Sequence, residues 1–481
     1  MAKNAKWDSS VSFILAMIGA SVGLGNIWRF SYIVYSNGGG SFFIPYLIAI
    51  AIMGIPFLIL EYGIGFSFKD SFTNIFKRIN PRFEYVSWII IMIIFTVGVY
   101  YVVIIGWDWA YLFSSFTFAW GNDPATYFVN TIGGNSDLSK PISFILPTTV
   151  SVLIIWFLVW FISHKSLDKG IGKFSRVAIP ILFVIMMGIN IYALTLPGAN
   201  LGIETLINPN WSLLLNINVW LAAFSQILFS LSMGQAIVIT LSSYLPEDSK
   251  LIDNVLIVVI SNSLFEIFTA FGVFSILGYM SHNSGVAMNQ LITEGTGLVF
   301  IVFPKIFNLM GPVGRILAPL FFLVILFAGM TSIIGILEPV INSILHKLNI
   351  SRKKAATIVC GVACIGSLIY TLNVGSYFLG IVDGFVNTFC VLLFVAVQCI
   401  IFSWVFDIKS LIPILNENST FKVGKTWVVL IKYILPVLIV IMWLMGVYNV
   451  LLNAESIVLY IYLIITMFII ILSGILYKIK V

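Results

Sequence analysis

The chain has 481 residues, of which 60% are hydrophobic and only 9% are charged, and its mean hydropathy is +1.08. This composition excludes a soluble globular domain and predicts a protein that lies in a lipid bilayer. The net charge of +6 does not indicate a nucleic-acid partner, because the basic residues gather in loops on one side of the expected spans. This positive-inside bias predicts a multi-pass protein of the cell membrane with both termini in the cytoplasm.

Long apolar runs predict an all-α polytopic fold in which residues 1–481 form a single membrane domain. About 20 apolar residues are needed to cross the hydrocarbon core as a helix. By that measure we expect about twelve spans. They lie at roughly 10–35, 41–66, 86–118, 143–163, 174–196, 217–243, 252–280, 313–346, 355–373, 376–405, 427–450 and 456–478.

The first expected span is interrupted at its centre. Residues 21–29 read Ser-Val-Gly-Leu-Gly-Asn-Ile-Trp-Arg between apolar flanks. Irregular backbone at membrane depth is tolerated only where it lines a cavity inside the protein, because an unpaired backbone group in hydrocarbon costs several kcal/mol. An arginine at that depth indicates a pathway or a gate. The interruption therefore predicts a binding site within span 1.

Span 6 carries a second interruption, in which residues 224–236 contain hydroxyl groups, amides and a glycine. Paired interruptions at corresponding positions of two halves are typical of secondary transporters. We expect a five-plus-five inverted repeat, with 10–196 as the first repeat, 217–405 as the second, and 427–478 as two added spans. An ordinary polar helix interface would explain span 6 alone but not both breaks.

These segments resemble the neurotransmitter:sodium symporter family. The resemblance rests on an ordered series of segments through spans 1 to 10. It comprises residues 19–30, Asn37 to Gly40, Ile44 to Tyr46, Tyr100-Tyr101, Gln226 to Gly234, and Phe327 to Ser332. It implies the leucine-transporter fold of the family's bacterial and archaeal amino-acid branch, with discontinuous helices 1 and 6.

The same resemblance implies two sodium sites built from backbone carbonyls, hydroxyls and amides. The first is expected near Ser21, Asn26, Ser230 and Asn262, completed by the carboxylate of the substrate. The second is expected at Gly19, Val22, Ala328, Thr331 and Ser332.

Gly23 indicates the class of substrate. Family members that carry biogenic amines have a carboxylate at this position, so the glycine favours a substrate with its own carboxylate. The expected protein is a sodium-coupled symporter that imports a neutral amino acid by alternating access. The candidate substrate-binding residues are Ala20, Ser21, Gly23, Leu24, Gly25, Val97, Tyr101, Phe229, Ser230, Ser232, Gln235, Ser332, Ile333 and Ile336. Gln235 replaces an aromatic residue that is common in relatives with apolar substrates.

Glu266 lies one helical turn from Asn262 and occupies the place where some relatives need chloride. A fixed carboxylate there predicts transport without chloride, and its neutralisation on the return step would imply proton antiport.

The outer gate is expected to consist of Arg29 and Asp383, with Gln226 nearby. On the cytoplasmic side the resemblance extends to Trp7 and Tyr244. The two positions where relatives have an ion pair hold Asn4 and His346 in this sequence. The sequence therefore leaves open how this gate closes.

The sequence also bears on other functions. An enzyme is not expected, because all three histidines lie at span ends or in loops and no catalytic constellation is visible. A proton-coupled carrier of the same fold would lack the hydroxyls of Thr331 and Ser332 at the second sodium site. A non-transporting amino-acid sensor stays open, as does the oligomeric state.

Overall fold

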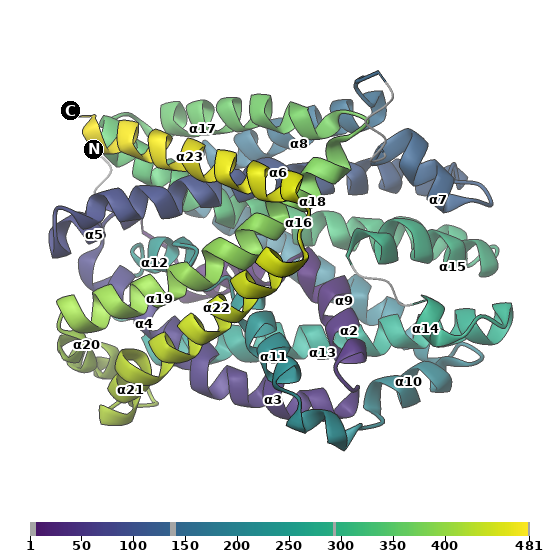
Figure 1. Cartoon of the computed structure of the whole chain (residues 1–481), viewed down its shortest axis with the longest axis horizontal. Coiled ribbons are helices and arrows are strands. Elements are labelled where there is room, and N and C mark those ends of the chain that lie inside the picture. The colour runs from purple at the N-terminus through teal and green to yellow at the C-terminus, as the bar shows by residue number, and fades with distance from the viewer. Residues whose placement is uncertain (1–5, 135–140, 292–294, 480–481) are drawn as a thin grey trace.

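The computed structural model describes residues 6–134, 141–291 and 295–479, and within these ranges the regular elements are all helices. The long helices run side by side across the view of Figure 1. Short helices mark the two ends of the bundle in that view. They are α5 (Phe72–Ile79), α20 (Leu411–Glu417) and α21 (Lys425–Val429) on the left, and α7 (Pro124–Tyr127), α10 (Ala199–Ile207), α14 (Met288–Leu291) and α15 (Phe303–Leu309) on the right.

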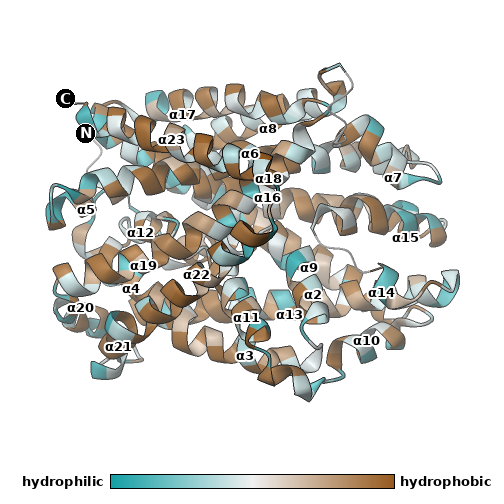
Figure 2. Ribbon diagram, viewed as in Figure 1, coloured by the Kyte–Doolittle hydropathy of each residue, from teal (hydrophilic) through white to brown (hydrophobic). Residues whose placement is uncertain are grey.

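Ten helices of the described chain are long and apolar enough to cross a membrane, and one bent helix pair adds an eleventh candidate. The ten span Gly40–Phe68 (α3, Phe43–Ala49, and α4, Ile55–Phe68), Phe83–Thr117 (α6), Leu146–Ser163 (α8), Asp168–Leu194 (with α9, Lys173–Leu194), Leu251–Ser284 (α13), Gly314–Leu348 (α16), Arg352–Thr371 (with α17, Arg352–Ser367), Gly375–Val405 (α18, Gly375–Phe385, and α19, Leu392–Ile400), Lys425–Asn453 (α21 with α22, Leu435–Asn453) and Ser456–Lys478 (α23). Figure 2 shows these helices brown along much of their length, with teal gathered toward the two ends of the bundle. Expected span 6 falls outside this set because it is divided into two short helices.

The bent pair is the interrupted first span. Helix α1 (Ser10–Ser21) and helix α2 (Leu24–Ser36) meet at an angle of 52°. The Asn26 side chain caps the second half, because its Oδ1 accepts a 2.8 Å hydrogen bond from the Gly23 amide. The glycine at position 23 allows the backbone to lie close to Ser332 and Tyr101. A Cβ there would lie 3.0 Å from Ser332 Oγ and 3.3 Å from the Tyr101 hydroxyl.

The sixth span breaks between α11 (Ile217–Ser230) and α12 (Ile237–Ser242). Three residues of the connecting stretch have positive φ: 53° at Ser232, 75° at Gly234 and 59° at Ala236. Left-handed backbone costs roughly 1–2 kcal/mol at a non-glycine residue, and such strain concentrates at functional sites. Both expected breaks are therefore present, at the expected places.

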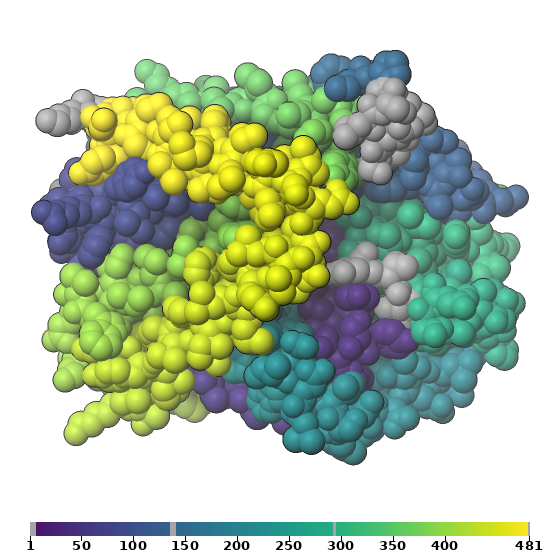
Figure 3. Space-filling view, viewed as in Figure 1, coloured from purple at the N-terminus to yellow at the C-terminus, as the bar shows by residue number. Residues whose placement is uncertain are grey.

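The two broken spans lie together at the centre. Helix α2 packs against α11, and α1 packs against α12, α13 and α16. By contrast, α23 buries only Ile469 and Ser473. Figure 3 shows α22 and α23, the yellow elements, lying across the outer face of the bundle. These two helices therefore lie at the periphery of the bundle.

Candidate functional site

A cavity of about 810 Å³ opens between the two broken spans. Its wall includes every candidate substrate-binding residue except Ile333, which is fully buried in α16. Asn26, Arg29, Gln226 and Asp383 also line it. Residues far apart in the sequence therefore meet around one space.

The residues expected at the first sodium site form one buried cluster. The Asn26 Nδ2 atom donates to Asn262 Oδ1 over 2.9 Å and to Ser230 Oγ over 3.4 Å. Asn262 Nδ2 in turn donates to Ser230 Oγ over 2.5 Å. Ser21 Oγ is buried without a hydrogen-bond partner. Amide and hydroxyl oxygens of this kind are the hard donors that suit a monovalent metal cation.

The residues expected at the second sodium site also come together, where α1 ends against α16. Ser332 Oγ donates to the carbonyls of Gly19, over 3.2 Å, and Val22, over 3.4 Å. Thr331 Oγ1 donates within its own helix, to the carbonyls of Phe327 over 2.9 Å and Ala328 over 3.1 Å. The Ser332 hydroxyl thus meets two carbonyls of α1, and the Thr331 side chain lies against Gly19. Within the described ranges, no group of three or more His, Cys, Asp or Glu residues could hold a metal.

Glu266 is fully buried and is held by three neighbours. Its Oε1 accepts from Gln226 over 2.7 Å and from Asn26 over 3.2 Å, and its Oε2 accepts from the Tyr46 hydroxyl over 2.5 Å. A buried carboxylate is tolerable only with such hydrogen bonds. Tyr46 was not among the candidates, although it stands in the Ile44-Pro45-Tyr46 segment that carries the resemblance.

The two expected outer-gate residues, which both line the cavity, have separate partners. The Arg29 guanidinium lies over the Phe229 ring, 4.2 Å from its centroid, and donates to Ser225 Oγ over 3.4 Å. Asp383 accepts from the Tyr100 hydroxyl over 2.8 Å. Within the described part of the chain Arg29 and Asp383 make no direct ion pair, although both line the cavity.

The opposite end of the bundle contains an ion pair that the sequence reading missed. Glu338 is fully buried, and Arg352 donates to both of its carboxylate oxygens, over 2.7 and 2.6 Å. The Tyr244 hydroxyl donates to the same carboxylate over 3.0 Å. The pair lies at positions other than Asn4 and His346, of which Asn4 is outside the described residues. This end of the bundle therefore does have an ion pair, supplied by α16 and the first residue of α17.

Trp7 adds to the closure of this end. Its indole Nε1 donates to the Leu241 carbonyl over 2.9 Å, and its backbone amide donates to the Tyr244 carbonyl over 3.2 Å. These bonds fasten the segment before α1 to the end of α12.

A second set of hydrogen bonds joins α1 to the start of span 5. Asp168 accepts from Ser12 Oγ over 2.7 Å and from Arg176 over 2.9 Å. The hydrogen bond to Asp168, together with the negative charge of that carboxylate, raises the pKa of the exposed Asp8 carboxyl. Asp8 therefore keeps its proton to a higher pH than an isolated aspartate. The proton favours the hydrogen bond between the Asp8 and Asp168 carboxyl groups.

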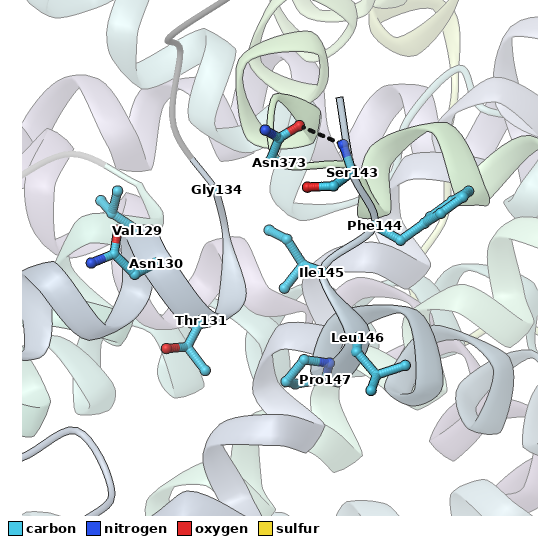
Figure 4. Close-up of a pocket in the computed structure, with 10 residues that line it drawn as sticks. All are labelled: Val129, Asn130, Thr131, Gly134, Ser143, Phe144, Ile145, Leu146, Pro147 and Asn373. Carbon is cyan, nitrogen blue, oxygen red and sulfur yellow. Dashed lines mark hydrogen bonds between the residues drawn. The ribbon is translucent and has the colours of Figure 1, made fainter. Parts of the chain in front are cut away.

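A smaller hollow of about 350 Å³ lies apart from the central cavity, where α8 begins. Figure 4 shows its lining, including the bond from the Ser143 amide to Asn373 Oδ1, which measures 3.3 Å. The ten lining residues carry no charged side chain.

A helical bundle broken at two adjacent spans, with grouped oxygen donors around the breaks, defines a secondary transporter. The model of the sodium:neurotransmitter symporter family matches residues 4–136 and 123–480. The chain belongs to this family of sodium-dependent multi-pass membrane transporters, and it is not an enzyme.

The chain is similar to known proteins over most of its length. An uncharacterized sodium-dependent transporter of Methanocaldococcus jannaschii is 38% identical over 437 residues, covering 90% of this chain and 88% of the relative. The sodium-dependent serotonin transporter of Drosophila melanogaster is 29% identical, covering 92% and 76%. The crystal structure of MhsT in complex with L-phenylalanine has a TM-score of 0.78 and 29% identity, covering 92% of this chain and 100% of MhsT. The expected family and fold are thus confirmed.

Proposed function

We propose that this chain is a symporter that imports a neutral amino acid, driven by two sodium ions. The observation that carries this proposal is the convergence of two oxygen clusters on the break in span 1. Ser21 and Asn26 belong to the first cluster, Gly19 and Val22 belong to the second, and Gly23 lies between them at the cavity wall. Ions bound at both clusters would hold the two halves of span 1 against α13 and α16.

The substrate carboxylate would lie at the N-terminus of α2. Free amide groups and the helix dipole favour an anion there. The Tyr101 hydroxyl is placed to assist, since it already lies 3.4 Å from the Leu24 amide. Gly23 supplies no carboxylate for an amine-only substrate. The complex of MhsT with L-phenylalanine supports a free amino acid as the substrate class.

Binding of the amino group is assigned to the stretch from Phe229 to Ser232. Residues from α6 and α16, together with Gln235, would surround the side chain. In this arrangement the substrate carboxylate completes the first sodium site, which couples amino-acid binding to sodium binding.

Chloride is not required in this proposal, because Glu266 supplies a negative charge beside the first sodium cluster. Its hydrogen bonds with Gln226, Asn26 and Tyr46 are the contacts on which this assignment rests. Release of sodium would leave the carboxylate to be neutralised by a proton, so proton antiport is a consequence to be measured.

Alternating access would use the two ends of the bundle. Arg29 and Asp383 would approach each other above Phe229 when the outer side closes, whereas the Trp7 bonds and the Tyr244–Glu338–Arg352 contacts would release when the inner side opens. We assign the end with Trp7 and Arg352 to the cytoplasm of the cell membrane. The basic loops support this orientation, and twelve spans return the chain to the side from which it starts.

Uptake by purified protein in liposomes tests this function. Accumulation of a labelled amino acid should require an inward sodium gradient and persist when chloride is replaced by gluconate. A proton-coupled carrier of the same fold would instead accumulate substrate under a pH gradient without sodium. A sensor would bind the amino acid but would not exchange labelled for unlabelled amino acid across the liposome membrane.

A further inference from the structure

Gln235 is the unusual residue of the cavity wall. It lies in the irregular stretch between α11 and α12, between Gly234 and Ala236, both of which have positive φ. Its side chain is half-buried and lines the cavity. Within the described chain, the structure contains no hydrogen bond to its amide group.

The N–H groups of other amides close by are all engaged, although Gln226 Oε1 and Gln398 Oε1 have no hydrogen-bond partner among the described residues. Asn26 and Gln226 donate to Glu266. Asn387, also on the cavity wall, donates to Asp383 over 3.0 Å. Gln398, which does not line the cavity, donates to the Gly234 carbonyl over 2.7 Å. Gln235 thus offers the cavity an amide with both donor and acceptor capacity still available.

The remaining wall of this part of the cavity is largely apolar. It includes Ala20, Val97, Ile336 and Val391. The hydroxyls of Ser232 and Ser332 already donate to the carbonyls of span 1. A ligand side chain that enters here therefore meets hydrocarbon walls and one unpaired amide.

Resting on the function proposed above, we propose that the transported amino acid carries an uncharged hydrogen-bonding group in its side chain, an amide or a hydroxyl, which pairs with Gln235. An apolar side chain would remove water from the Gln235 amide and return no hydrogen bond, and a buried unpaired amide is costly. A site that hydrogen-bonds a substrate group discriminates strongly against the analogue that lacks it. Gln235 is then the specificity-determining residue of the side-chain pocket.

Three pairs of amino acids with similar shapes isolate the hydrogen bond from size: threonine with valine, asparagine with leucine, and glutamine with methionine. Binding of each would be measured in sodium by competition against a labelled amino acid that binds, using the full-length protein in detergent. For the pair that fits best, we expect the polar member to bind at least about tenfold more tightly. Equal or tighter binding of the apolar member in all three pairs overturns the inference.

The variant Gln235→Met should remove this preference or reverse it. Gln290→Met is the control, since it deletes the same amide from an exposed position outside the cavity wall. A preference that survives in Gln235→Met also overturns the inference, and a preference lost equally in both variants does the same. The wild-type comparison decides the matter by itself if either variant fails to fold.

The experiment separates this inference from the function on which it rests. If no amino acid of any class binds in sodium, the proposed function fails. If amino acids bind in a sodium-dependent way but the apolar members are preferred, only the assignment of Gln235 fails.

Discussion

Glu266 on α13 and Tyr46 on α3 are joined by a hydrogen bond of 2.5 Å, and both side chains are fully buried. The carboxylate that receives this bond is also held by Asn26, a residue of the first oxygen cluster. A carboxyl group is thereby placed beside a candidate sodium site.

Replacement of the carboxylate should create a chloride requirement. In Glu266→Ser the site loses its only acidic side chain, while a hydroxyl remains to accompany a bound anion. Sodium-driven uptake should fall to near background in gluconate and recover as chloride is added. The wild type measured in the same two buffers is the control. Uptake by the variant that is equal with and without chloride would refute the assigned role of Glu266.

The hydroxyls at the junction of α1 and α16 should set the affinity for sodium. A hydrogen-bonding or coordinating group beside a charge contributes about 1.5–3 kcal/mol. Ser332→Ala and Thr331→Ala should therefore raise the sodium concentration for half-maximal substrate binding by roughly tenfold or more. Ser343→Ala removes a buried hydroxyl from the same helix outside the cavity wall and should leave that concentration unchanged. An equal effect of all three substitutions would contradict the second sodium site.

The inner ion pair predicts a marked difference between single and double variants. Arg352→Met leaves Glu338 buried and unpaired, and breaking a buried pair costs about 3–5 kcal/mol. The closed inner end should open, which a cysteine placed at Ser12 and labelled from the cytoplasmic side would report. Arg352→Met combined with Glu338→Met should restore much of the closure, because replacing both partners with apolar groups is often neutral. Labelling of the single variant at the wild-type rate would exclude a gating role for this pair.

The space around Gly23 predicts that even a methyl group is harmful. The Cβ of Gly23→Ala would lie 3.0 Å from Ser332 Oγ and 3.3 Å from the Tyr101 hydroxyl. Amino-acid binding should be lost or weakened by about tenfold or more, while the protein still elutes as a folded species. Gly361→Ala is the control, because a Cβ there meets nothing within 4 Å and the residue lies outside the cavity wall. Wild-type affinity in Gly23→Ala would show that substrate does not approach this position.

The two broken spans could be predicted from the sequence because their signals are local. Glycine, asparagine and serine inside an apolar run are visible in a window of a dozen residues. The same is true of the candidate oxygen donors, whose placement in one cavity follows once the family resemblance orders the spans.

The contacts that the sequence did not predict depend on how the helices pack. Glu338 and Arg352 are only 14 residues apart but lie on different helices, α16 and α17, whereas the resemblance pointed to the positions of Asn4 and His346. A carboxylate inside an apolar span was the available signal, since such a group requires a partner. Tyr46 was missed because its partner Glu266 lies 220 residues further along the chain.

The dependence of amino-acid uptake on the sodium gradient tests the central claim most directly. Purified full-length protein in liposomes would be given a panel of labelled amino acids, with an inward gradient of sodium or of potassium at the same pH on both sides. We predict that at least one neutral amino acid accumulates above its external concentration only with the sodium gradient, and that collapsing this gradient releases it. Accumulation that is equal in sodium and potassium, or that follows only a pH gradient, would contradict sodium-coupled symport.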